Sequence, residues 1–201
     1  MASYEPRDKF YRKARDRGLP SRAAFKLDEI IARFRLVPAG SPLVLDLGSA
    51  PGGWLAILSP LVGPLGRVVG SDLAPIKFSF PNTLIVAGDI KDPLVQDEIA
   101  LALDGAADLI TSDMAPKLTG IKAHDQARSA ELVAIALALA KRLLRSGGAM
   151  VVKVFMGTEF QPLLDDFKRC FAKVETTHPK ASRPGSSELY LVARGFRRFA
   201  K

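Results

Sequence analysis

Leu43-Val-Leu-Asp-Leu-Gly-Ser-Ala-Pro-Gly-Gly-Trp54 is the stretch that decides the fold. Its first five residues form a short apolar run typical of a buried strand. Three glycines follow, Gly48, Gly52 and Gly53, and the residues from 53 to 62 have a helical pattern. Glycine lets the backbone approach a ligand closely and adopt positive φ. A strand, glycine loop and helix in this order form the place where open α/β sheets bind ligands.

Short apolar runs and helix-like segments alternate along the rest of the chain. Further strands are expected at 67–72, 83–89, 108–113, 149–155, 174–178 and 188–196, and further helices at 93–103, 125–145 and 159–171. The helix at 125–145 is expected to end at a glycine cap, Gly147-Gly148. Such alternation implies a mainly parallel sheet with helices on both faces. The last two strands have no helix between them, so we expect them to pair antiparallel. The predicted fold is α/β, a doubly wound, mostly parallel seven-stranded sheet with an antiparallel C-terminal edge hairpin.

The positive charge lies at the two ends of the chain. The net charge is +8; residues 1–35 hold ten Lys/Arg against five Asp/Glu, and residues 178–201 hold six against one. The part between them holds 13 against 15. We expect one domain over 1–201. Within it, a linker-like cluster, Pro38-Ala-Gly-Ser-Pro, separates a basic helical segment at 1–35 from a sheet core at 40–201. The basic ends suit a polyanion, although solubilising tails would carry the same charge.

Several features limit the class of protein. Cys170 is the only cysteine, which excludes an internal disulfide and suits a reducing compartment. The first residues lack the apolar stretch of a secretory signal, and the longest apolar run, 132–139, is too short to cross a bilayer. The only histidines, His124 and His178, have no ligand spacing around them. We therefore expect a cytoplasmic protein that requires neither membrane nor metal.

Two acids follow strands beyond the glycine loop. Asp72 ends the second predicted strand and Asp89 the third. A carboxylate at the first place can accept both hydroxyls of a cofactor ribose, and one at the second can accept from an adenine amino group. The loop is neither the dinucleotide pattern nor a phosphate loop. The combination favours S-adenosylmethionine, which has a ribose and an adenine but no pyrophosphate, although either acid could be a helix cap or a turn residue.

Four charged residues stand in locally apolar contexts. They are Lys26, Asp113, Lys153 and Glu188, each in a separate segment. Charged groups rarely enter such surroundings unless they are paired or functional. We interpret them as a two-lysine, two-carboxylate active site beside the cofactor. Structural ion pairs are the alternative, and for Lys26 a position on the wet face of an amphipathic helix would also account for its charge.

A resemblance to a known family adds to this interpretation. It is carried by Ser21-Arg-Ala-Ala-Phe-Lys-Leu-Asp-Glu-Ile, Asp46-Leu-Gly-Ser-Ala-Pro-Gly-Gly-Trp, Ser112-Asp-Met-Ala-Pro, Val152-Lys-Val-Phe and Ser187-Glu-Leu-Tyr. From about residue 9 to 196 the chain resembles the RrmJ/FtsJ family of S-adenosylmethionine-dependent RNA ribose 2′-O-methyltransferases, which have a Rossmann-like class I methyltransferase fold. The resemblance implies a catalytic tetrad of Lys26, Asp113, Lys153 and Glu188, with cofactor contacts at Gly52, Trp54, Asp72, Asp89 and Asp113. Ala24 stands where bacterial ribosomal members carry an aromatic residue, and Lys117 where they carry Asn.

The chemistry implied by this resemblance is physically consistent. A sulfonium is an activated methyl donor, so positioning of a ribose oxygen supplies much of the acceleration. A base that takes the 2′-hydroxyl proton contributes roughly 10²–10⁴-fold. Lys153 is the candidate base and must then be neutral, which the charge of Lys26 would favour and the two carboxylates would oppose. A charged Lys153 that only orients the hydroxyl is the alternative.

The basic ends supply a candidate nucleic-acid face. Arginine with aromatic side chains suits phosphates and the splayed bases of RNA loops. The N-terminal cations are interleaved with Tyr4, Phe10 and Tyr11, and a second group surrounds Glu188 in the sequence. The predicted RNA contacts are Arg7, Lys9, Arg12, Lys13, Arg15, Arg17, Arg22, Arg183, Arg194, Arg197 and Arg198. If Glu188 lies at the active site, the second group is expected to flank it.

The resemblance to short bacterial and organellar members implies a substrate. We expect methylation of large-subunit ribosomal RNA, with a uridine as the target. We expect the protein to be a monomer that binds the RNA or the large ribosomal subunit. A tRNA anticodon loop is the nearest alternative substrate. A non-catalytic RNA-binding assembly factor and a small-molecule methyltransferase are alternatives of other classes. The tetrad and glycine loop disfavour the assembly factor, and the basic ends disfavour the small-molecule enzyme.

Overall fold

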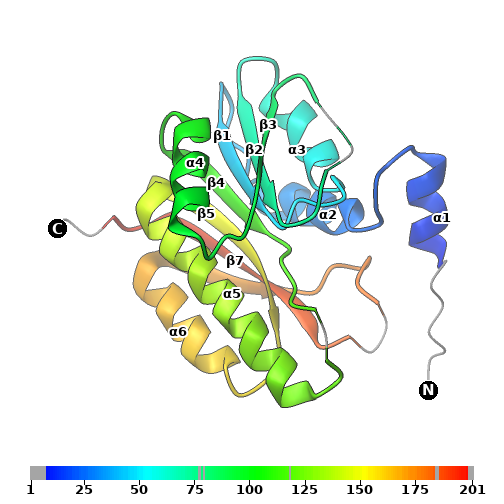
Figure 1. The fold of residues 1–201 in the computed structure, drawn as a ribbon, viewed down its shortest axis with the longest axis vertical. Coiled ribbons are helices and arrows are strands. Elements are labelled where there is room, and N and C mark those ends of the chain that lie inside the picture. Colours follow the sequence, from blue (N-terminus) through cyan, green and yellow to red (C-terminus); the bar gives the residue numbers. More distant parts are fainter. Residues whose placement is uncertain (1–7, 77, 79, 118, 184–185, 199–201) are drawn as a thin grey trace.

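A computed structural model describes residues 8–76, 78, 80–117, 119–183 and 186–198, which form one sheet flanked by helices (Figure 1). The strands are β1 (Leu43–Leu47), β2 (Arg67–Asp72), β3 (Thr83–Ala87), β4 (Ala107–Ser112), β5 (Leu144–Phe155), β6 (Phe171–Thr177) and β7 (Glu188–Phe196). The helices are α1 (Lys9–Asp16), α2 (Ala24–Phe34), α3 (Leu55–Val62), α4 (Pro93–Leu103), α5 (Lys122–Leu143) and α6 (Phe160–Cys170). Among the described residues, no helix combines the length and the apolar character that a membrane span requires.

The strand order is β3-β2-β1-β4-β5-β7-β6. The five strands β3, β2, β1, β4 and β5 are parallel to one another. Strand β7 lies between β5 and β6 and is antiparallel to both. This confirms the predicted α/β fold with an antiparallel C-terminal hairpin. The chain reverses its direction of strand addition between β1 and β4, so the loops after these two strands separate there and leave room for a ligand.

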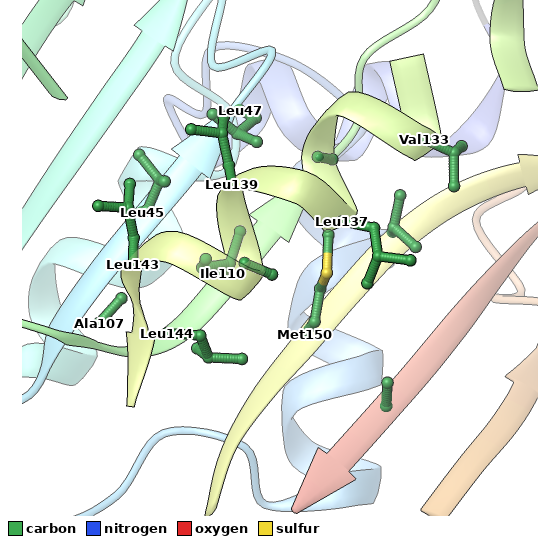
Figure 2. Packing of buried hydrophobic residues seen from close by; sticks show 14 of the residues in the cluster. Leu45, Leu47, Ala107, Ile110, Val133, Leu137, Leu139, Leu143, Leu144 and Met150 are labelled. Atoms are coloured by element: carbon green, nitrogen blue, oxygen red, sulfur yellow. The ribbon is translucent and has the colours of Figure 1, made fainter. Parts of the chain in front are cut away.

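Alternate residues of each strand face two separate apolar cores. On one face Leu45, Ile110 and Met150 pack against α4, α5 and α6, and Figure 2 shows part of this cluster. On the other face Val44 and Tyr190 belong to a cluster with α2 and α3. Because side chains alternate along a strand, Asp46 and Lys153 fall on the α2 and α3 face.

The end of α5 differs from the sequence prediction. Leu144 follows the helix directly in an extended conformation (φ −80°, ψ 135°) and begins β5. Gly147 and Gly148 therefore lie inside β5 and form no helix cap. The pairing partners shift from Ala107 with Leu144 to Leu109 with Ala149. The surplus residues of β5 make an irregularity in which Gly147 has φ +77°, a conformation that glycine adopts without strain.

Candidate active site

The structure brings the four predicted charged residues together at one edge of the sheet. Asp113 follows β4, Lys153 lies near the end of β5, and Glu188 begins β7. Because β7 is antiparallel to β5, the start of β7 pairs with the end of β5, with Phe155 opposite Glu188. Lys26 enters from the first turn of α2. Two parallel strand ends, one antiparallel strand start and one helix thus meet.

Lys153 and Asp113 form the inner ion pair. The Lys153 Nζ lies 3.0 Å from Asp113 Oδ1 and donates to the Asp113 carbonyl oxygen at 2.6 Å. Only 6% of Lys153 is exposed. A buried ammonium needs such partners because its desolvation is costly. Both contacts fix the position of Nζ at the end of β5.

Lys26 and Glu188 form the outer ion pair. The Lys26 Nζ donates to Glu188 Oε1 at 2.6 Å, and both side chains are mostly buried. The same carboxylate oxygen accepts from the hydroxyl of Ser182 at 3.1 Å. Lys26 therefore does not lie on a wet helix face.

Tyr190 connects the two pairs. Its hydroxyl donates to Asp113 Oδ1 at 2.8 Å and accepts from Lys26 Nζ at 3.4 Å. Burial, followed by the charges of Asp113 and Glu188, raises the pKa of Tyr190 well above its usual value. The phenol therefore remains a neutral donor. The sequence prediction did not include Tyr190, although its position two residues after Glu188 places both on the same face of β7.

The glycine loop fits tightly against its neighbours. Gly48 has φ +77°, and a Cβ there would lie 2.8 Å from the backbone nitrogen of Met114. Gly52 has φ +108° and lies under Phe78. A Cβ at Gly53 would lie 2.2 Å from Ser21 Oγ. Gly48 thus permits contact with the loop after β4, whereas Gly53 permits contact with the segment before α2.

Trp54 also connects the glycine loop to the segment before α2. It is buried, its indole nitrogen donates to the Ala23 carbonyl oxygen at 2.9 Å, and its ring centroid lies 5.9 Å from that of Tyr190. These contacts connect the glycine loop to α2 and to the tetrad.

A pocket opens beside Gly48, with about 490 Å³ of empty space that includes its part open to solvent. Asp72 and Asp89 both line it. Its full lining is Leu47, Gly48, Ser71, Asp72, Leu73, Gly88, Asp89, Ile90, Met114, Ala115 and Leu132. The mixture of apolar side chains and two carboxylates suits an adenine and a ribose.

Both acids also stabilise turns. Asp72 accepts from the backbone nitrogens of Ala50 and Ala74 at 2.9 and 2.8 Å. Asp89 accepts from the backbone nitrogen of Lys91 at 2.9 Å. Each carboxylate oxygen has more than one lone pair, so these bonds leave acceptor capacity toward the pocket.

Two buried polar atoms near the loop have no partner among the described residues. They are Asp46 Oδ2 and Ser21 Oγ. Burial raises the pKa of Asp46 to about 7, although Thr111 donates to its other oxygen at 2.7 Å. Unsatisfied buried polar groups are costly. Neither residue lines the pocket, so the fit of the site to S-adenosylmethionine rests on Asp72 and Asp89, which do.

The predicted RNA contacts on α1 lie on the surface. Lys9, Arg12, Lys13, Arg15 and Arg17 are all exposed. Lys13 Nζ and the Arg17 guanidinium lie 5.1 and 5.7 Å from the centroid of the Phe25 ring. Arg7 lies outside the described residues. These cations form a basic surface beside an aromatic ring.

Arg22 differs from these cations. It donates to Asp8 and to the Ala181 carbonyl oxygen, and only 13% of its side chain is exposed. Its charge is already compensated within the protein.

The expectation that the second group of arginines flanks Glu188 is wrong for Arg194, Arg197 and Arg198. Arg194 pairs with Ala149, at the opposite end of β5 from Phe155. At a rise of about 3.3 Å per residue, Arg194 lies about 20 Å from Glu188 along β7. It also forms an ion pair with Glu175. Arg197 and Arg198 are exposed beyond that far end, whereas Arg183 is exposed in the β6–β7 loop near Glu188.

Comparisons with known proteins agree with the geometry. Residues 19–196 match the model of the FtsJ-like methyltransferase family. The chain is 48% identical to ribosomal RNA large subunit methyltransferase E of Anaeromyxobacter dehalogenans, over 96% of this chain and 73% of the relative. It is 45% identical to the protein of the same name from Myxococcus xanthus, over 98% and 92%. A structure described as a ribosomal RNA methyltransferase from Plasmodium falciparum superimposes with a TM-score of 0.76 at 28% identity, covering 88% of this chain and 98% of that one.

Proposed function

This chain belongs to the FtsJ-like methyltransferase family, and we propose that it methylates a ribose 2′-hydroxyl of large-subunit ribosomal RNA with S-adenosylmethionine. The observation that carries the proposal is the single hydrogen-bonded network of Lys26, Asp113, Lys153, Glu188 and Tyr190. The names of the bacterial relatives support the substrate. A uridine target, a cytoplasmic location and a monomeric state are further parts of the proposal.

The cofactor would be held by the pocket and the loop. Asp72 would accept the ribose hydroxyls and Asp89 the adenine amino group, while Gly48 and Gly52 allow close approach of the backbone. When bound, S-adenosylmethionine supplies a methyl group already activated by its sulfonium.

Lys153 is the group that we propose takes the ribose proton. An ammonium cannot accept a proton, so the Lys153 Nζ that contacts Asp113 would first release a proton to solvent and then take the ribose proton. The Asp113 carboxylate then stabilises the resulting ammonium. Lys26 and Glu188, joined to this pair through Tyr190, place a cation near the attacking oxygen, where negative charge develops as the proton leaves.

Replacement of Lys153 tests this role. Lys153→Ala should abolish methyl transfer, whereas calorimetric affinity for the cofactor should stay within a few-fold of wild type. Lys153→Arg is the matched control, because arginine keeps the charge but cannot give up its proton. An inactive arginine variant supports a base, and near-wild-type turnover of this variant would assign Lys153 the role of a charged orienter.

The substrate is tested with total RNA and labelled cofactor. Label is expected on a ribose of large-subunit RNA, and mapping identifies the nucleotide. Label in tRNA would replace the proposed substrate, and absence of label from every RNA would favour an assembly factor.

A further inference from the structure

Helix α1 is joined to the rest of the described molecule through a small contact, and it stands beside the sheet in Figure 1. Ala14 is buried together with Phe25 of α2 and Ala181 of the β6–β7 loop. The Phe10 ring lies 6.0 Å from that of Phe25. The helix with the exposed cations therefore rests on α2 and on the loop that leads to Glu188.

Arg22, which lies just before α2, contacts both the beginning of α1 and the β6–β7 loop. One of its nitrogens donates to Asp8 Oδ2, and another donates to the Ala181 carbonyl oxygen. Asp8 is the N-cap of α1, and its Oδ1 accepts from the backbone nitrogen of Tyr11 at 2.9 Å. The planar guanidinium can serve two acceptors at once in a fixed geometry. The beginning of α1, the approach to α2 and the β6–β7 loop thus share one anchor.

The loop continues directly from this anchor to the active site. Ser182 is buried, and its hydroxyl donates to Glu188 Oε1, the oxygen that also accepts from Lys26. On the other side of the anchor, the Lys180 backbone nitrogen donates to Glu29 of α2 at 2.9 Å. Both partners of the outer ion pair are therefore held by segments that Arg22 joins.

We propose that Arg22 is a positioning residue for Glu188, acting through the β6–β7 loop and Ser182. The proposal rests on the proposed function, because Glu188 is assigned to the active site there. Asp8 compensates the charge of Arg22, so a phosphate gains little by approaching it. The Arg22 guanidinium thus holds both α1, which carries the exposed cations, and the loop that positions Glu188. The position of α1 and the geometry of the tetrad therefore depend on the same contacts.

Kinetics of Arg22→Ala against the exposed control Arg12→Ala test the proposal. Arg22→Ala should lower kcat by about 10- to 100-fold, because small displacements of a catalytic group have such effects. Its KM for RNA should change by less than about three-fold, and the salt dependence of KM should not change. Arg12→Ala should raise KM and reduce the salt slope by about 1, as expected for a phosphate contact.

A second route uses Ser182. Ser182→Ala should lower kcat in the same way, and the double variant with Arg22→Ala should lose less than the two single losses combined, because both act on Glu188. Fully additive losses would overturn the proposal. So would an Arg22→Ala variant with unchanged kcat, whether its KM and salt slope follow those of Arg12→Ala or remain as in wild type.

Hydrogen exchange without RNA separates this proposal from the proposed function. Peptides that contain Ala181 and Ser182 should exchange faster in Arg22→Ala than in wild type, whichever RNA is the substrate. Unchanged exchange would overturn the anchor role even if ribosomal RNA is methylated. If Arg22→Ala does not melt cooperatively, Arg22→Lys is measured instead; it reaches fewer acceptors, so the same changes are expected in smaller size.

Discussion

The side chain of Tyr190 is fully buried, and its hydroxyl contacts both ion pairs of the site. It gives Asp113 Oδ1 a hydrogen bond in addition to the contact with Lys153. Among the described residues, it is the group that forms hydrogen bonds with both the inner and the outer pair. The Tyr190 hydroxyl and the Lys153 Nζ thus share Asp113 Oδ1 as their partner.

Tyr190→Phe removes this hydroxyl and keeps the ring beside Trp54. We expect a loss of about 2 kcal/mol of unfolding free energy, typical of one hydrogen bond to a charged group, and a fall of about ten-fold in the single-turnover rate. Denaturant unfolding and quenched-flow methylation measure the two. Tyr11→Phe, at an exposed tyrosine of α1, is the control and should keep wild-type stability. A wild-type rate in Tyr190→Phe would show that the bridge has no catalytic part.

Asp46 carries a second residue-scale consequence. Burial raises its pKa from 3.8 to about 7. Between these pH values the folded protein holds a proton that the unfolded chain has lost. The contribution of Asp46 to the free energy of unfolding therefore falls as pH rises from about 4 to about 7, and it levels off above that range.

Asp46→Asn removes this titration. Urea unfolding without cofactor from pH 4 to pH 8 should show the variant gaining on wild type across that window, by about 4 kcal/mol at most. Thr111→Val, which removes the hydrogen bond that lowers the folded-state pKa, should extend the upper end of this window to higher pH and leave its lower end unchanged. Parallel curves for wild type and Asp46→Asn would show that Asp46 titrates alike in both states.

The sequence predicted the tetrad because a charge in an apolar run is visible in the chain itself. It did not predict Tyr190, Ser182 or the unsatisfied oxygen of Asp46. Tyrosine, serine and a strand-end acid are ordinary in their local contexts. Only the register of β7 against β5 and the docking of the β6–β7 loop give them their partners.

At the scale of elements, β7 shows both the reach and the limit of pattern analysis. Its bounds, Glu188–Phe196, agree with the prediction. We nevertheless predicted wrongly that Arg194 flanks Glu188, because the two residues are close in sequence. In an extended strand, six residues already span about 20 Å. The glycines after α5 were misassigned for a related reason, since glycine suits a strand irregularity as well as a helix cap.

The glycine loop between β1 and α3 yields an element-scale prediction. Gly48→Ala should lower the melting temperature and weaken cofactor binding by more than about ten-fold, because the new Cβ meets the Met114 backbone at 2.8 Å. Gly63→Ala is the matched control, since Gly63 has φ +68° but nothing within 4 Å of a Cβ. It should lose some stability and keep its affinity, as calorimetry would show. Equal affinity losses would assign the effect to backbone strain.

For the whole molecule, the two basic ends have different positions. The cations of α1 lie beside α2 and the β6–β7 loop, on the side of the tetrad, whereas Arg197 and Arg198 lie beyond the far end of β7. We therefore expect the positive field that would steer a polyanion toward the tetrad to come from the N-terminal side.

Neutralising Arg12, Lys13 and Arg15 together should weaken RNA binding and reduce the slope of log K against log salt by about 2 to 3. The control neutralises Arg197 and Arg198, which are also exposed, and should leave the slope unchanged. Filter binding at several salt concentrations measures both. A larger effect from the far pair would move the RNA face to the other end of the sheet.

The antiparallel β7 has a neighbouring strand on each side, β5 and β6. Outer strands such as β3 open in local fluctuations more readily than strands paired on both sides. Fraying at either rim therefore leaves Glu188 and Tyr190 in place, so these two residues should keep their contacts until the molecule unfolds as a whole.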